Sequence, residues 1–216
     1  DAHGDVVDAD PRGEPVVRNE ILALSPSPAA LNLAGAAGFV VIRESMLGSL
    51  DLKIVSLAIP AGLSPGSALR KLRRADPDGT YDYNHIYFGA GRTMAASTHG
   101  PGQVSTVRAV KEAGAGLKIG LVDAGVSPVN AWLDQARIRR WGCDGQILSS
   151  PHGTAVASLL VGSGARFAGV LPHGELYAAD IYCGTPTGGN ALTLVAALAW
   201  LAQQGVSVIN ISLVGP

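Results

Sequence analysis

The chain has 216 residues, of which 47% are hydrophobic and 15% are charged, and its formal net charge is −1. This composition is typical of a globular protein with enough apolar side chains to form a core. The balanced charge provides no basic surface for nucleic acid or an anionic membrane, which argues against binding functions of that kind. An apolar run at residues 192–201 has the length of a buried helix and is too short to span a bilayer.

The first residues carry neither the basic nor the apolar region of a signal peptide. The sequence starts at Asp1, so we expect either that a signal has been removed or that the sequence was cut at this point. Residues 1–15 are rich in Asp, Gly and Pro, which predicts a flexible leader. The two cysteines, Cys143 and Cys183, are compatible with one disulfide in a secreted protein and equally with two buried thiols.

Residues 16–88 alternate between strand-like and helical segments. Pro26 and Pro28 suit the first turn of a helix, and Ser64-Pro65 opens a second, amphipathic helix. The predicted elements are strands at 16–24, 39–44, 52–60 and 80–88 and helices at 29–37 and 64–75. The order β-α-β-β-α-β predicts a small ferredoxin-like α+β domain.

Residues 89–116 are rich in Gly, Ser and Thr and predict a linker, with one short helix near 107–113. Beyond this linker, apolar strands alternate with helices, which predicts an α/β domain with a parallel sheet covered on both faces. The predicted strands are 117–122, 176–181 and 206–211, and the predicted helices are 152–162 and 191–204.

Two side chains in this second part are candidates for chemistry. Asp123 follows a buried strand, and sites in open α/β sheets lie outside the carboxyl ends of the strands. A carboxylate there can orient a histidine, or it can merely cap a turn. His152 lies in the first turn of an Ala-rich helix, and a single histidine in such a place is more often structural. The other four histidines are interpreted as structural.

Taken together, three motifs resemble those of the subtilisin-like serine proteases, the subtilases. They are Val-Asp-x-Gly-Val at 122–126, Pro-His-Gly-Thr-x-Val-Ala-Ser at 151–158 and Val-Ile-Asn-Ile-Ser-Leu-x-Gly-Pro at 208–216. Gly-Val-Leu-Pro at 169–172 is similar to a further family segment, and the resemblance covers roughly residues 116–216. It implies a serine endopeptidase in which Asp123 is the triad aspartate and His152 is the general base.

The resemblance also implies a cleft that holds a polypeptide substrate as an extended strand. Its two walls would be the backbone segments Ser212-Leu213-Val214 and Thr187-Gly188-Gly189. No cofactor is required for the chemistry, and no metal ligands are assigned. Calcium is frequent in the family, but no Asp-rich loop indicates a site for it here.

Subtilases are made with a ferredoxin-like propeptide that assists folding and inhibits the protease with its C-terminal tail. Residues 16–88 have the predicted topology and the position of such a propeptide, so they are interpreted as one. Self-cleavage would then fall in the linker at 89–116, at a bond that the sequence does not identify. The implied partners are polypeptide substrates and the chain's own propeptide, and the implied location is secreted or periplasmic.

Three features depart from the family pattern. Ala124 stands where a Thr or Ser usually supports the aspartate, and Val214 replaces a Gly at the cleft wall. No serine up to Pro216 stands in the Gly-Thr-Ser context of the family nucleophile, so this serine is predicted beyond the chain. Residues 117–216 are accordingly interpreted as the N-terminal half of a catalytic domain, inactive by itself, with the remaining half as a separate or further segment.

Two alternatives stay open at this point. The first is a non-catalytic protein, either a pseudoprotease fragment or a propeptide-type inhibitor and folding module. The second is an unrelated α/β protein that binds a nucleotide or metabolite. The second is disfavoured because no Gly-rich phosphate loop follows a strand, and Gly114-Ala115-Gly116 precedes one.

Overall fold

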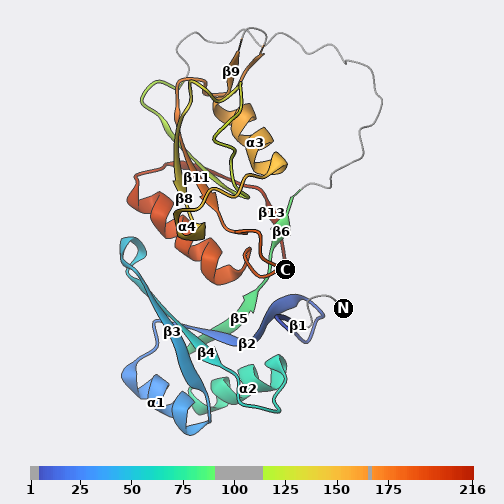
Figure 1. Cartoon of the computed structure of the whole chain (residues 1–216). Coiled ribbons are helices and arrows are strands. Elements are labelled where there is room, and N and C mark those ends of the chain that lie inside the picture. Colours follow the sequence, from blue (N-terminus) through green and yellow to red (C-terminus); the bar gives the residue numbers. More distant parts are fainter. Residues whose placement is uncertain (1–4, 91–113, 165–166) are drawn as a thin grey trace. The chain divides into compact units, whose positions relative to one another are not determined.

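The computed structural model describes residues 5–90, 114–164 and 167–216 (Figure 1). The short helix expected near 107–113 lies outside these residues. The chain divides into two compact units. The first unit combines residues 1–88 with 181–205 and 214–216, and the second combines 89–180 with 206–213. In the described part of the chain, no helix has the length and apolar character needed to cross a membrane.

Within the first unit, residues 7–85 form an antiparallel sheet with two helices, in the order β-β-α-β-β-α-β along the chain. Sheet neighbours follow the order β1-β2-β4-β3, and β5 also pairs with β2. A 3-10 turn, η1 (Gly48–Leu50), joins the two strands of the hairpin. The remaining elements are β1 (Val7–Ala9), β2 (Pro15–Leu24), α1 (Pro28–Ala36), β3 (Val40–Leu47), β4 (Leu52–Ala58), α2 (Pro65–Ala75) and β5 (Thr80–His85).

Both helices start where a serine precedes a proline. The Ser27 hydroxyl accepts a hydrogen bond from the Ala30 N–H at 3.1 Å, at the start of α1. The Ser64 hydroxyl does the same for Ser67 at 3.4 Å, at the start of α2. These side chains satisfy N–H groups that have no partner within the first helical turn. The local sequence therefore determines where each helix begins.

The two faces of this sheet are buried differently, because successive side chains on a strand point to opposite sides. One face packs on α1 and α2 and forms an apolar core. Its members include Ile21, Val55, Leu57, Leu69 and Leu72, all at most 4% exposed. This core accounts for the amphipathic pattern that identifies α2 in the sequence.

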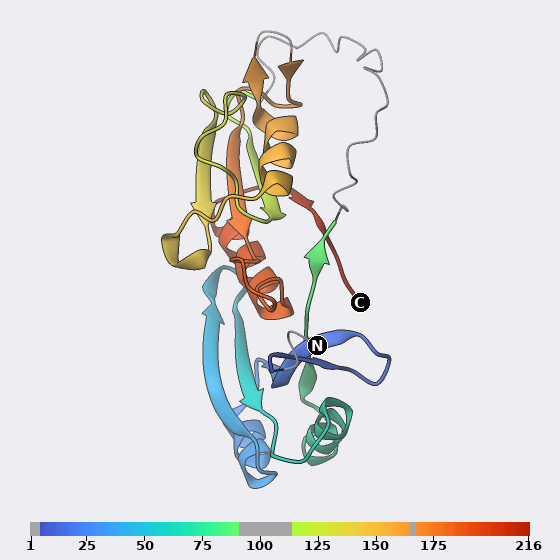
Figure 2. The ribbon, with the colours of Figure 1, turned by 45° about the vertical axis from the view of Figure 1, so that its right-hand side comes forward.

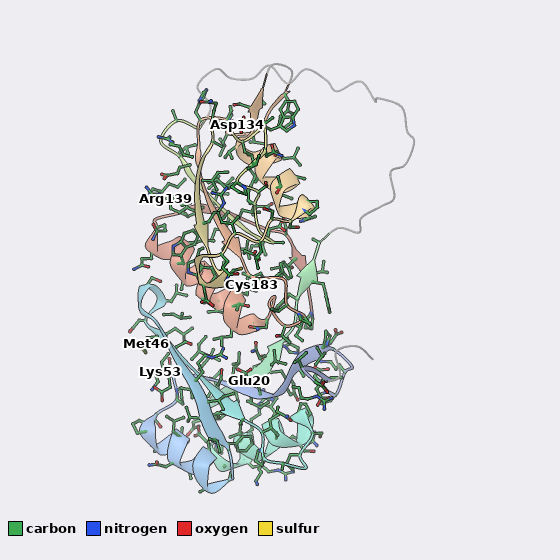
Figure 3. All side chains as sticks on the ribbon, in the orientation of Figure 1. Glu20, Met46, Lys53, Asp134, Arg139 and Cys183 are labelled. Carbon is green, nitrogen blue, oxygen red and sulfur yellow. The ribbon has the colours of Figure 1, made fainter. Side chains whose placement is uncertain are left out.

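The opposite face packs on α4 (Ala191–Gln203), which belongs to the same unit. Leu22 and Ile54 contact Leu192 there in a small apolar cluster. Polar groups share this face. The Asn84 side chain accepts a hydrogen bond from the Leu192 N–H at 3.1 Å, and Glu20 on β2 is 6% exposed (Figure 3). The face thus combines apolar and polar contacts, unlike the apolar core on the other side.

The flexible leader predicted at 1–15 is wrong for its described part. β1 pairs antiparallel with the start of β2, and Asp10, 6% exposed, closes the turn between them. Its Oδ1 accepts hydrogen bonds from the N–H groups of Arg12 and Glu14 at 2.8 and 2.9 Å. His85 Nε2 lies 3.6 Å from the other carboxylate oxygen. The abundance of Asp, Gly and Pro reflects this tight turn rather than disorder.

We expect Asp10→Asn to lower the melting temperature at pH 7 but to have little effect near pH 3. Desolvation opposes ionisation of Asp10, but the two backbone N–H groups and His85 outweigh it and lower its pKa. The stabilisation by the carboxylate is therefore present above the pKa of the unfolded chain, about 3.9, and is lost as the pH falls through the lower folded pKa. Thermal unfolding at both pH values tests this, with the exposed Asp78→Asn as control. Equal effects of Asp10→Asn at both values would contradict it.

The second unit is built on a parallel sheet with strand order β12-β7-β11-β8. Helix α3 (Pro151–Val161) packs through Ala157 and Val161 on an apolar cluster that contains Leu121 and Leu176. The strands are β7 (Lys118–Asp123), β8 (Arg137–Trp141), β11 (Glu175–Asp180) and β12 (Val208–Ile211). Shorter elements are η2 (Cys143–Gly145), β9 (Ser163–Gly164) and β10 (Phe167–Ala168). The predicted α/β class with a parallel sheet is confirmed.

Strand β8 is absent from the sequence prediction because its composition, Arg-Ile-Arg-Arg-Trp, is not that of a buried strand. It lies at the end of the strand order, where β11 is its one partner among the described strands. Arg139 instead forms an ion pair with Glu175 of β11, with 2.8 Å between Nε and Oε1 (Figure 3). The hydrogen bond from Arg139 lowers the pKa of Glu175. Charged side chains on such a strand protect a sheet edge against pairing with other chains.

Candidate active site

Asp123 ends β7, a strand with neighbours on both sides. Its side chain is 1% exposed, and Oδ1 accepts a hydrogen bond from the N–H of Ala124 at 2.6 Å. The carboxylate is thus held at the carboxyl end of the sheet, the edge at which sites of open α/β sheets lie. A carboxylate buried in this way is stabilised by hydrogen bonds from polar partners.

His152 supplies one of these partners. It lies in the first turn of α3, and its Nδ1 is 2.8 Å from Oδ1 of Asp123. Its side chain is 36% exposed, whereas that of Asp123 is buried. An imidazole held through Nδ1 by a carboxylate has its other nitrogen, Nε2, available to accept a proton. The arrangement is suited to general-base chemistry.

Close backbone packing brings the two side chains together. A Cβ on Gly153 would lie 2.0 Å from the carbonyl oxygen of Ala124, so only glycine lets the helix start approach the loop after β7. The Ser150 N–H donates to the carbonyl of Gly125 at 2.7 Å. The Thr154 hydroxyl accepts a hydrogen bond from the Ser127 N–H at 2.9 Å. The Gly and Thr of the His-Gly-Thr motif therefore position the histidine.

The second carboxylate oxygen of Asp123 is less well supported. Oδ2 is buried and has no hydrogen-bond partner among the described residues. The side chain of Ala124, the next residue, has no group that can donate a hydrogen bond. A Ser or Thr at this position, usual in the family that the motifs resemble, carries a hydroxyl. The substitution to Ala thus coincides with an unpartnered oxygen.

The segment that follows β12 lies next to this strand end. The Ser212 N–H donates to the carbonyl of Val122, the residue before Asp123, at 3.0 Å. The Asn210 side chain donates to the Ser212 hydroxyl at 2.7 Å. Ser212 is therefore fixed beside the Asp–His pair, and β13 (Leu213–Val214) continues from it. Of the predicted Ser212-Leu213-Val214 segment, Ser212 is thus paired with the strand that ends in Asp123.

The other predicted segment, Thr187-Gly188-Gly189, forms a tight turn ahead of α4. The Thr187 carbonyl accepts a hydrogen bond from the Asn190 side chain, which also caps the helix by accepting from the Thr193 N–H. A Cβ on Gly188 would lie 1.6 Å from the carbonyl oxygen of Tyr182. The turn is thereby held by the cap of α4 and requires glycine at Gly188.

Residues 87–90 pair with both of these segments. The Tyr87 N–H donates to the Gly189 carbonyl at 2.5 Å, and the Ala90 N–H donates to the Ser212 carbonyl at 3.1 Å. Between them, β6 (Phe88–Gly89) pairs with β13. Figure 2 shows β6 and the C-terminal segment side by side and running in opposite directions. The single strand predicted at 80–88 is therefore two strands, β5 and β6, of which β6 has a different partner.

Both cysteines are disulfide-bonded, which resolves the alternative that the sequence left open. Cys143 lies in η2, and its sulfur is 3.8 Å from the carbonyl oxygen of Asp180, the last residue of β11. Gly142, just before it, has φ of +104°, and a Cβ there would lie 2.2 Å from the same carbonyl oxygen. The bonded cysteine is thus seated against the end of β11.

Comparison with protein families matches residues 114–215 to the subtilase family. No curated protein matches the chain. The matched residues contain β7, α3, β11, α4 and β12, and with them the Asp–His pair. The predicted resemblance is confirmed for residues 114–215, which match the subtilase family of subtilisin-type serine peptidases.

Proposed function

We propose that this chain is the propeptide and the N-terminal part of the catalytic domain of a secreted subtilisin-type endopeptidase. The observation that carries the proposal is the 2.8 Å contact between a buried carboxylate and a half-exposed imidazole at the carboxyl end of a parallel sheet. The subtilase match of the residues that form this contact supports the same conclusion.

In the proposed mechanism, His152 accepts the proton of a serine hydroxyl as that oxygen attacks the carbonyl carbon of a substrate. Asp123 keeps the Nδ1 proton on the imidazole and stabilises the imidazolium that forms. The serine is supplied from outside residues 1–216. Among the described residues, the hydrogen bond of the imidazole goes to Asp123, and no serine hydroxyl shares it.

The substrate is proposed to bind as an extended strand against the backbone of Thr187-Gly188-Gly189 and Ser212-Leu213-Val214. Backbone pairing of this kind binds many side-chain sequences, and pockets for alternate side chains supply the preference. The pairing that residues 87–90 make with Gly189 and Ser212 supports this proposal. Tyr87 and Ala90 donate through backbone N–H groups, which a polypeptide substrate also has.

The propeptide role of residues 16–88 is supported by the face that the sheet presents to α4. An apolar cluster around Leu22 and Ile54 shares this face with the buried polar residues Glu20 and Asn84. Mixed faces are typical of interfaces that separate, whereas a permanent core is more apolar. The ferredoxin-like order of the elements and their place before the subtilase match agree with this role. The disulfide-bonded cysteines support secretion, because disulfides persist in oxidising compartments.

The catalytic part of the proposal can be tested with a fluorophosphonate, which modifies an activated serine. In the protein expressed from its complete reading frame, we expect one labelled serine and loss of the label in His152→Ala. The exposed His173→Ala is the matched control and should keep the label. Absence of label in the unmodified protein would favour a pseudoprotease. Full labelling of His152→Ala would exclude this histidine as the base.

A further inference from the structure

We infer that the peptide bond on the carboxyl side of Ala90 is the self-processing bond of this protein. The inference rests on the proposed function and adds the bond and the substrate preference that the pairing of residues 87–90 implies. Substrates of the same class carry an aromatic residue three positions before the residue that precedes the cleaved bond.

Hydrogen bonds set the register of this segment. Ala90 donates to the carbonyl of Ser212 at 3.1 Å, and β6 pairs with β13 in the preceding two residues. Since the two run in opposite directions, the chain from Tyr87 to Ala90 advances toward Ser212. Backbone pairing holds these residues extended, the form in which peptide recognition by strand addition presents a chain.

The same hydrogen bonds connect Ala90 to the Asp–His pair. Ser212, which accepts from Ala90, itself donates to the carbonyl of Val122 at 3.0 Å. Asp123 follows Val122 and holds His152 at 2.8 Å. The paired residue nearest to the Asp–His pair in this register is therefore Ala90. The upstream residues 80–85 are unsuitable, because β5 is paired with β2 in the first unit.

The position of Tyr87 indicates where an aromatic side chain is accepted. A Cβ on Gly215 would lie 2.1 Å from Cδ1 of Tyr87, so the ring rests directly on this glycine. A Cβ on Gly189 would lie 2.6 Å from the Tyr87 carbonyl oxygen. Both glycines leave the space that Tyr87 occupies. This space accounts for the preference for an aromatic residue three positions before Ala90.

The reaction is hydrolysis and needs only the serine hydroxyl and water. The serine oxygen bonds to the Ala90 carbonyl carbon while His152 takes its proton. The C–N bond after Ala90 then breaks, and His152 gives this proton to the departing amine. Water next attacks the resulting ester and loses a proton to His152, which returns it to the serine oxygen. The products are an Ala90 carboxylate and a free amino group on the following residue.

The bond is identified by the mass of the first N-terminal fragment released from the protein expressed from its complete reading frame. We expect a fragment that ends at Ala90. A first fragment that ends elsewhere overturns the inference. If no fragment appears while the serine is still labelled by fluorophosphonate, the inference fails and the proposed function stands. If neither fragment nor label appears, both fail.

Two variants test the register itself. Ala90→Glu should slow release of the fragment at least about tenfold, because Ala90 is half-buried where its backbone pairs with Ser212, and a longer, charged side chain is costly to bury there. Ala61→Glu, at an exposed position, is the control and should leave release unchanged. Gly215→Ala should also slow release, and a second change, Tyr87→Ala, should restore part of the rate by removing the ring. A rate for Ala90→Glu equal to the control, or additive effects of the last two changes, would contradict the proposed register.

Discussion

Replacement of Asp123 with asparagine is expected to lower kcat of the complete protein by about 10⁴-fold while the fold is retained. Asp123 is 1% exposed and accepts from Nδ1 of His152 at 2.8 Å. An asparagine amide of the same shape can donate to Nδ1 and so stabilise the tautomer in which Nε2 carries the proton. That imidazole cannot accept a proton from serine. Steady-state hydrolysis of a peptide p-nitroanilide at saturating substrate measures the effect.

Asp134→Asn is the matched control for this experiment. Asp134 is an exposed aspartate of the same unit, and its substitution changes the net charge equally (Figure 3). We expect near-normal kcat for this variant. Circular dichroism should show unchanged folding in both. A decrease of less than tenfold for Asp123→Asn would mean that the carboxylate does not set the tautomer, although it lies beside the ring.

Gly153→Ala is expected to lower both stability and activity. The added Cβ would lie 2.0 Å from the carbonyl oxygen of Ala124, and backbone atoms cannot yield as a flexible side chain can. Relief requires the start of α3 to move away from the loop after β7, which separates His152 from Asp123. Forced repacking of this kind costs about 1–3 kcal/mol, and a displacement of about 1 Å at a reacting group can cost about 10²-fold in rate. Denaturant unfolding and fluorophosphonate labelling rates measure the two effects.

Gly35→Ala distinguishes this close contact from a general effect of glycine substitution. Gly35 lies in α1, and a Cβ there would meet no atom within 4 Å. Alanine favours a helix over glycine, so this variant should be as stable as the original or more stable by up to about 1 kcal/mol. If Gly153→Ala unfolded at the same denaturant concentration as Gly35→Ala, the backbone approach would not constrain the site.

The sequence predicts the elements that local chemistry determines. The Ser-Pro starts place α1 and α2, and the strand and helix that carry Asp123 and His152 were located within one or two residues. Neither residue was convincing alone. The spaced motifs identified them, and the family match supports the same region. A motif of several residues at a fixed spacing therefore predicts a site residue more reliably than a single side chain does.

The features that the sequence missed depend on distant partners. β1 exists because it pairs with β2, and its own three residues carry no strong strand signal. β8 is rich in arginine because it lies at the end of the described strand order, and this composition does not resemble a buried strand. The second pairing of residues 87–90 depends on Gly189 and Ser212, which lie more than a hundred residues further along the chain. No local sequence pattern indicates partners that lie so far away in the chain.

The central place of β7 in the sheet has a consequence for how the two members of the pair move. β7 hydrogen bonds to β11 on one side and β12 on the other. Amide hydrogens of a strand paired on both sides exchange with solvent only in large openings of a domain, whereas helix ends open readily. Asp123 thus lies on a strand whose amide hydrogens are expected to exchange slowly. His152 lies in the first turn of α3, which is expected to open more readily. When a peptide binds, we therefore expect the imidazole of His152 to move while the carboxylate of Asp123 stays in place.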